Sequence, residues 1–84
     1  MVAITRDRMM GILQDQGCQV VGTSEEFNGW KGGIWLSSEG SKLLEYYGFY
    51  DTLGVEPNLD AMVNDWGWHF EWYDAGTMMC WPNN

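Results

Sequence analysis

Apolar residues near the N-terminus of the chain recur at the spacing of a helix that buries one face. These positions are Ile4, Met9, Ile12 and Leu13. Thr5 is a residue type that caps helix N-termini, and Asp7 suits the positive end of the helix dipole. Gly17 suits the left-handed position that follows many helices. The pattern therefore predicts a helix over residues 6–16.

A second helical stripe occurs in the C-terminal half of the chain. Its apolar positions are Leu59, Met62, Val63 and Trp66. Pro57 suits the first position of a helix, where an amide hydrogen would have no partner, and Asp60 falls in the first turn. Gly67 is placed as the cap. We expect a helix that begins at Pro57 and ends before Gly67.

Four short segments alternate with the period of two that is typical of strands. They cover residues 18–21, 34–37, 68–73 and 77–81. Residues 22–33, between the first two strands, are rich in turn-forming residues, and Asn28–Gly29 is a dipeptide typical of hairpins. Residues 74–76 join the last two strands as a predicted three-residue loop.

The stretch between the second strand and the second helix has no clear period, and two interpretations stay open. Leu43, Leu44 and Tyr47 slightly favour a short helix over residues 42–47. The other interpretation is a strand that follows a turn at Glu39–Gly40.

The predicted order is α-β-β-α-β-β, and a faint internal repeat agrees with it. Residues 12–20 align with residues 62–70, and an Asp-x-Gly motif recurs between them, although two identities in nine positions do not establish a duplication. The order predicts the α+β class, with residues 1–84 as a single domain. We expect a four-stranded, mainly antiparallel sheet with two helices packed on one face.

Alternation along the strands assigns each side chain to one of two faces. The face expected against the helices is wholly apolar and carries Cys18, Val20, Ile34, Leu36, Trp68, Phe70, Trp72, Met78 and Cys80. The opposite, outer face is expected to carry Val21, Trp35, His69, Glu71, Tyr73, Met79 and Trp81. A three-residue loop would place His69 opposite Trp81, Glu71 opposite Met79 and Tyr73 opposite Thr77.

The outer face is too apolar for a surface that is simply left in water. Large exposed apolar patches usually mark binding sites, and Trp, Tyr and Met are typical of interface hot spots. The alternative is that residues 43–54 fold over this face and make it a second small core.

The net negative charge is concentrated in the C-terminal half of the chain, and this bears on which partners the protein can bind. Residues 1–42 contain five acidic residues and four Lys or Arg, whereas residues 43–84 contain seven acidic residues and no Lys or Arg. A surface of this sign repels phosphate backbones and anionic membranes, so we expect no direct nucleic acid or membrane binding. A protein partner with a basic surface is the natural complement. The alternative is that the charge only keeps a domain rich in aromatic residues in solution.

The two cysteines, Cys18 and Cys80, are predicted to be free, buried thiols in a reducing compartment. The first ten residues contain charges where a secretory signal would have an apolar run, which favours a cytoplasmic location. No apolar run approaches the roughly 18 residues that a membrane span needs.

Catalysis receives little support from the residue types. His69 is the only histidine, and Glu71 shares its strand face, but no activated nucleophile accompanies this pair. No metal-binding motif is present, and the neighbouring Glu25 and Glu26 are more typical of a solvated surface than of metal ligands. We therefore expect no enzyme activity, no metal and no cofactor.

The leading hypothesis is a small acidic protein that docks on a basic, possibly nucleic-acid-handling, surface of a larger protein. Its expected binding residues are Trp35, His69, Glu71, Tyr73, Met79, Trp81, Glu25 and Glu26. In size and charge, though in no motif, the chain is similar to the small inhibitors that phages and mobile elements direct against host nucleases and defence systems.

Two other hypotheses stay open. Trp35, Tyr73 and Trp81 could line a pocket for a small polar or cationic ligand that His69 and Glu71 orient. Alternatively the last strand could lie at the edge of the sheet and pair two copies of the chain in a homodimer.

Overall fold

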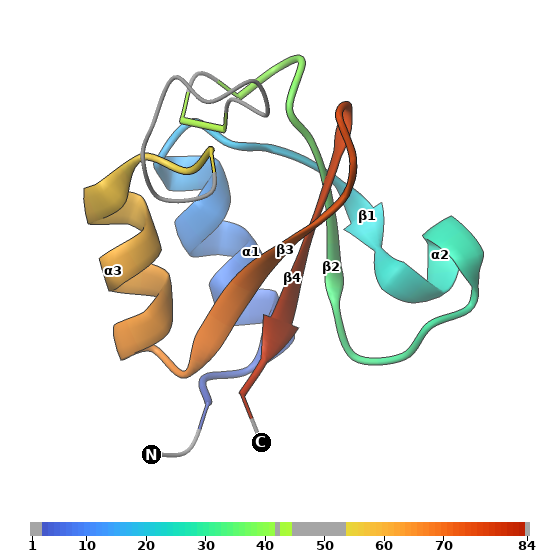
Figure 1. The fold of residues 1–84 in the computed structure, drawn as a ribbon. Coiled ribbons are helices and arrows are strands. Elements are labelled where there is room, and N and C mark those ends of the chain that lie inside the picture. The colour runs from blue at the N-terminus through green and yellow to red at the C-terminus, as the bar shows by residue number, and fades with distance from the viewer. Residues whose placement is uncertain (1–2, 42, 45–53, 84) are drawn as a thin grey trace.

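The structure is a computed structural model that describes residues 3–41, 43–44 and 54–83. The described elements, in chain order, are α1 (Arg6–Asp15), β1 (Gln19–Thr23), α2 (Ser24–Asn28), β2 (Ile34–Ser37), α3 (Pro57–Asp65), β3 (Trp68–Asp74) and β4 (Thr77–Pro82) (Figure 1). The predicted α+β class and the antiparallel sheet are confirmed. A third helix, α2, lies in the stretch for which only a turn was predicted. The proposed helix over residues 42–47 lies outside the described residues.

The two predicted helices begin and end as their sequence signals indicate. Thr5 caps α1 by accepting a hydrogen bond from the Arg8 amide, and Pro57 starts α3. Gly17 and Gly67 follow the helix ends with φ angles of 92° and 85°, the left-handed conformation that glycine adopts without strain.

The sheet has the strand order β1-β2-β4-β3, and all neighbouring strands are antiparallel. The expectation that the last strand lies at an edge is wrong, because β4 pairs with both β2 and β3. The edges of the described sheet are β1 and β3, so β4 is not available to extend the sheet into a second copy of the chain.

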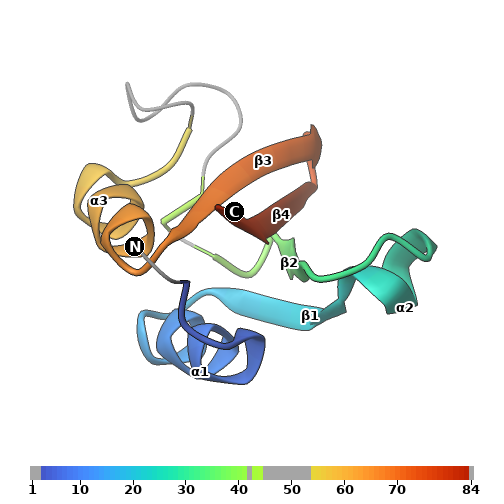
Figure 2. The ribbon, with the colours of Figure 1, turned by 90° about the horizontal axis from the view of Figure 1, so that it is seen from below.

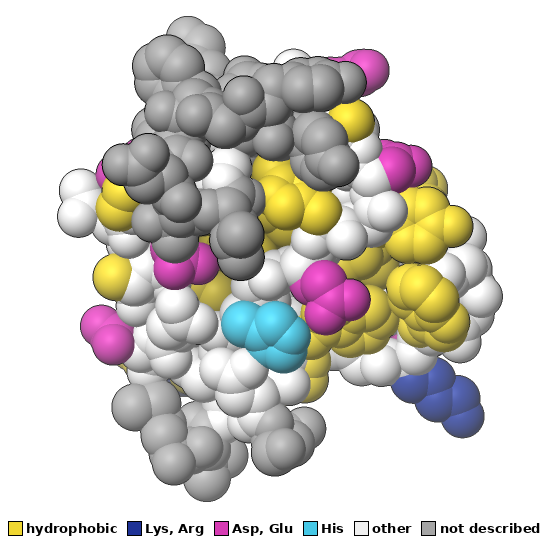
Figure 3. All heavy atoms as spheres, viewed as in Figure 1, with side chains coloured by type: hydrophobic (Ala, Val, Ile, Leu, Met, Phe, Trp, Pro, Cys, Tyr) yellow, Lys and Arg dark blue, Asp and Glu magenta, His cyan; other side chains and the backbone are white. Residues whose placement is uncertain are grey.

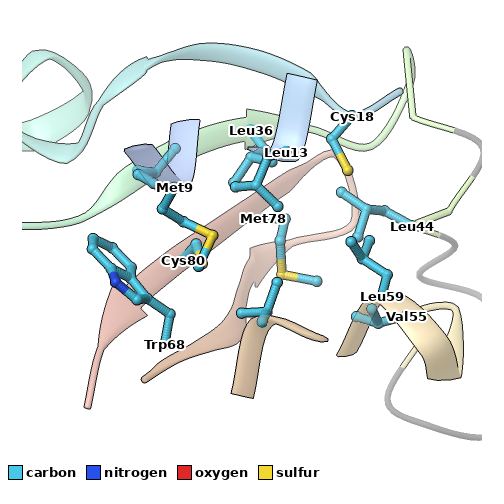
Figure 4. Packing of buried hydrophobic residues seen from close by; sticks show 12 residues of the cluster. Met9, Leu13, Cys18, Leu36, Leu44, Val55, Leu59, Trp68, Met78 and Cys80 are labelled. Carbon is cyan, nitrogen blue, oxygen red and sulfur yellow. The ribbon is translucent and has the colours of Figure 1, made fainter. Parts of the chain in front are cut away.

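The core lies between the sheet and helices α1 and α3, which occupy one side of the sheet while α2 lies at the other (Figures 1 and 2). Met9 and Leu13 from α1, and Leu59 and Val63 from α3, belong to one buried cluster (Figure 4). The nine residues predicted for the inner face lie in this cluster or pack against it. The wholly apolar strand face was therefore a correct indicator of the core.

The β3–β4 hairpin confirms two of the three predicted cross-strand pairs. His69 lies opposite Trp81, and Glu71 lies opposite Met79. The third pair is wrong, because Asp74 and not Tyr73 lies opposite Thr77, and the register shifts between Trp72 and Asp74. The Asp74 carboxylate accepts a hydrogen bond from the Gly76 amide at 3.0 Å, which tightens the connection and leaves one extra residue in β3.

Two described residues between β2 and α3, Leu44 and Val55, lie in the core between the sheet and the helices. Leu44 and Val55 form an isolated antiparallel bridge, and both are 2% exposed within the core cluster. The hypothesis that residues 43–54 cover the outer face therefore fails for Leu44, and residues 45–53 lie outside the described part. None of the helices described is long and apolar enough to cross a membrane.

Candidate functional site

The outer face of the sheet is covered by α2 and the loop that follows it. The Phe27 ring lies 5.0 Å from the Trp35 ring and 4.8 Å from the Tyr73 ring, measured between centroids. The Trp30 ring lies 5.9 Å from Tyr73 and 6.1 Å from Trp81. We call these five residues, Phe27, Trp30, Trp35, Tyr73 and Trp81, the aromatic patch.

The sequence patterns missed the two residues that cover the sheet, Phe27 and Trp30. A signal for α2 is nevertheless present, because Thr23 and Glu26 form a capping box. The Thr23 amide donates to the Glu26 carboxylate at 2.9 Å, and the Glu26 amide donates to the Thr23 hydroxyl at 3.3 Å. Asn28–Gly29 does not form the predicted hairpin turn, because Gly29, with φ of 88°, ends α2 instead.

Ser24 fixes the loop that carries Trp30. Its side chain is fully buried, and its hydroxyl donates to the Trp30 carbonyl at 2.6 Å. The same oxygen accepts a hydrogen bond from the buried Gly33 amide at 2.9 Å. One hydroxyl group thus closes the loop between α2 and β2 and holds Trp30 against the sheet.

Glu25 ties the same loop to α1. Its carboxylate accepts hydrogen bonds from the Gly32 amide at 3.1 Å and from the Arg6 guanidinium at 2.6 Å. The backbone amides of Glu25 and Gly32, together with Arg6, lower the pKa of this carboxyl from 4.5 to about 2. The predicted binding residues Glu25 and Glu26 both lie on the surface, and the structure gives each an intramolecular role in holding α2.

The predicted outer-face residues differ widely in exposure. Met79 is only 1% exposed, so the prediction that it lies on an accessible surface is wrong. Trp35 and Trp81 are half-buried, and Tyr73 is 52% exposed. Trp30, which was not among the predicted binding residues, is 49% exposed and therefore accessible to a partner.

Gly33 lets Trp81 lie close to the backbone at the start of β2. A Cβ atom on Gly33 would come within 2.5 Å of the Trp81 ring and 3.1 Å of the Cys80 carbonyl. The small residue is therefore a packing requirement of the aromatic patch.

Charged groups surround the exposed rings unevenly. Glu71 and Asp74, on either side of Tyr73 along β3, are both exposed, and Lys31 is exposed next to Trp30. Figure 3 shows hydrophobic side chains gathered on this face beside acidic side chains and the histidine. The face therefore combines exposed aromatic rings with a rim in which carboxylates predominate.

His69 is held by Asn83 at the end of β3. Asn83 donates from Nδ2 to the Trp68 carbonyl at 3.2 Å, so its Oδ1 faces Nδ1 of His69 as an acceptor. Because an amide oxygen only accepts, Nδ1 of His69 is the donor in this contact. The two cysteines, Cys18 and Cys80, are free and buried, as predicted.

The two thiols lie in surroundings that disfavour their charged form. Burial raises the pKa of Cys18 to about 11 and that of Cys80 further still, which keeps both thiols protonated. Within the described ranges, no three His, Cys, Asp or Glu side chains lie together as metal ligands would.

A pocket of about 140 Å³ lies away from the aromatic patch, between β3 and the start of α3. The described residues that line it are Val55, Asp60, Phe70, Glu71, Trp72 and Met78. Glu71 is the residue that this pocket shares with the rim of the patch.

Comparisons with protein-family models, with curated proteins and with solved structures find no match to the chain. The site must therefore be interpreted from its own geometry and charge.

Proposed function

We propose that the chain is a small acidic binding protein that docks on a basic surface of a larger protein through the aromatic patch. The observation that carries this proposal is the exposure of Trp30 and Tyr73, which each keep about half of their surface open above a packed cluster. Rings held this way lose little conformational entropy on binding, which makes them effective interface anchors. If the partner's basic surface handles nucleic acid, docking would inhibit it.

The contribution of each ring follows from its area. A large aromatic residue buries about 150–250 Å² when fully covered, so a half-exposed ring offers on the order of 100 Å². At about 25 cal/mol per Å², covering one such ring contributes roughly 2.5 kcal/mol. Two rings of this kind supply a substantial part of the free energy of a specific complex.

The carboxylates act over a longer range than the rings. The chain has a formal net charge of −8, and its C-terminal half contains no Lys or Arg. An acidic rim of this kind accelerates encounter with a basic surface and makes association depend on salt. Glu71 and Asp74, which are both exposed and lie close to Tyr73 along β3, are the carboxylates that we expect to contact such a surface.

Affinity capture from a lysate of the source cells tests the proposal. We expect a protein with a basic surface patch, retained at about 50 mM salt and weakened at about 500 mM because the Debye length shortens. The Trp30→Ala/Tyr73→Ala double variant should lose it, whereas Trp66→Ala should retain it, since Trp66 is 41% exposed at the end of α3 and outside the patch. Partners that bind the double variant equally well would contradict the proposal, and light scattering that shows a dimer would assign the patch to self-association.

Binding of a small molecule is the second candidate, and the pocket beside β3 is the observation that favours it. At about 140 Å³ the pocket is smaller than the roughly 300–1,000 Å³ of typical ligand sites. A thermal-shift screen with nucleotides and cationic metabolites separates the two candidates. Stabilisation by one compound, lost in the Asp60→Asn variant, would favour the pocket over the patch.

A further inference from the structure

We propose that the aromatic patch recognises arginine side chains in preference to lysine. This inference rests on the proposed function and deepens it by naming the group that the patch would contact. It would make the patch a selective site and not only an apolar anchor.

About half of the Trp30 and Tyr73 side chains is open to solvent and so accessible to a planar cation. Trp30 meets Tyr73 at an interplanar angle of 64° and Trp81 at 52°. Because these rings are tilted and not stacked face to face, none of the three hides the whole face of another. A guanidinium can therefore lie against a ring face on the open side of Trp30 or Tyr73.

An exposed carboxylate lies next to the aromatic patch along β3. Glu71 precedes Tyr73 by two residues, and both side chains are exposed. Its cross-strand partner is Met79, so it is also diagonal to Trp81, which pairs with His69. A guanidinium stacked on one of these rings could donate hydrogen bonds to the exposed Glu71 carboxylate at the same time.

This combination favours arginine for a physical reason. The guanidinium is planar and weakly hydrated, so it stacks on a ring and still presents its N–H groups sideways to a carboxylate. An ammonium is a strongly hydrated point charge that gains less from the ring. Lys31 places one positive charge beside Trp30, and Glu71 and Asp74 outnumber it on the rim.

Nuclear magnetic resonance with two peptides of equal charge, hexa-arginine and hexa-lysine, tests the inference on the intact protein. We expect hexa-arginine to shift the indole N–H signals of Trp30 and Trp81, and to bind at least about fivefold more tightly than hexa-lysine. The Trp66 signal serves as the internal control.

Two variants separate stacking from simple charge attraction. Glu71→Gln keeps the shape of the surface and should weaken hexa-arginine binding severalfold, while Trp30→Ala should remove the preference for arginine over lysine. Equal affinity for the two peptides in the wild-type protein, or an unchanged preference in Trp30→Ala, would overturn the inference. If that preference is absent but partner capture still depends on Trp30 and Tyr73, the inference alone fails; if capture ignores these rings, the proposed function fails independently.

Discussion

The buried hydroxyl of Ser24 offers a sharp test of how the aromatic patch is built. Ser24→Ala removes the donor to the Trp30 carbonyl and the acceptor of the Gly33 amide, and it leaves that amide buried without this partner. An unsatisfied buried group costs about 1–3 kcal/mol, and we expect a total loss of about 2–3 kcal/mol. A domain of this size has a free energy of unfolding of roughly 4–12 kcal/mol, so the loss is large enough to measure.

Urea unfolding followed by tryptophan fluorescence measures this loss. The transition midpoint should fall, and the native emission should shift to longer wavelength as Trp30 becomes more exposed. Asn64→Ala is a suitable control, because Asn64 is exposed and its side chain donates to the Asp60 carboxylate one helical turn away. We expect this change to alter stability by less than about 0.5 kcal/mol. A Ser24→Ala protein as stable as the control would refute the claim that this hydroxyl holds the loop.

Three further predictions concern the frame around the patch. Gly67→Ala should lower the melting temperature more than Gly17→Ala, because both positions have positive φ but only a Cβ at Gly67 would meet backbone, at 2.7 Å. Glu25→Gln should destabilise the protein above pH 4.5 in denaturant titrations, and its deficit should disappear as the pH falls toward 2, because the folded-state pKa is the lower one. The buried thiols Cys18 and Cys80 should resist iodoacetamide at pH 8 in the native protein and react once it is unfolded; equal labelling in both states would contradict their burial.

Local sequence patterns predicted most helices and strands, because the ends of these elements and their buried faces depend on residues that are close in sequence. Helix caps such as Thr5 and Gly17 act within one turn, and strand alternation reports burial on one side of a sheet. The same alternation identified the pairs His69–Trp81 and Glu71–Met79, since a short connection fixes the register of a hairpin.

The cover of the outer face could not be predicted in this way. A helix of five residues shows too little periodicity to reveal itself, and Asn28–Gly29 suits a hairpin turn as well as a helix end. The contact of Phe27 with Tyr73 depends on strand order, which brings residues distant in sequence together. Met79 was assigned to the surface for the same reason: alternation identifies a face but not what lies over it.

The position of Tyr73 illustrates how one residue can change a site. The tight connection made by Asp74 leaves Tyr73 as the extra residue of β3, without the cross-strand partner that simple counting assigned to it. Its ring meets Phe27 and Trp30 instead. Tyr73 thus stays on the outer face despite the shift in register, and its ring is the most exposed of the patch.

The central claim is that Trp30 and Tyr73 anchor the chain on a basic partner, and calorimetric titration of the captured partner tests it most directly. Since each ring contributes roughly 2.5 kcal/mol, Trp30→Ala should raise the dissociation constant about seventyfold, and the double variant with Tyr73→Ala should raise it further still. Trp66→Ala should bind as the wild type does. Wild-type affinity in the double variant, or a loss in Trp66→Ala equal to that in Trp30→Ala, would contradict the account.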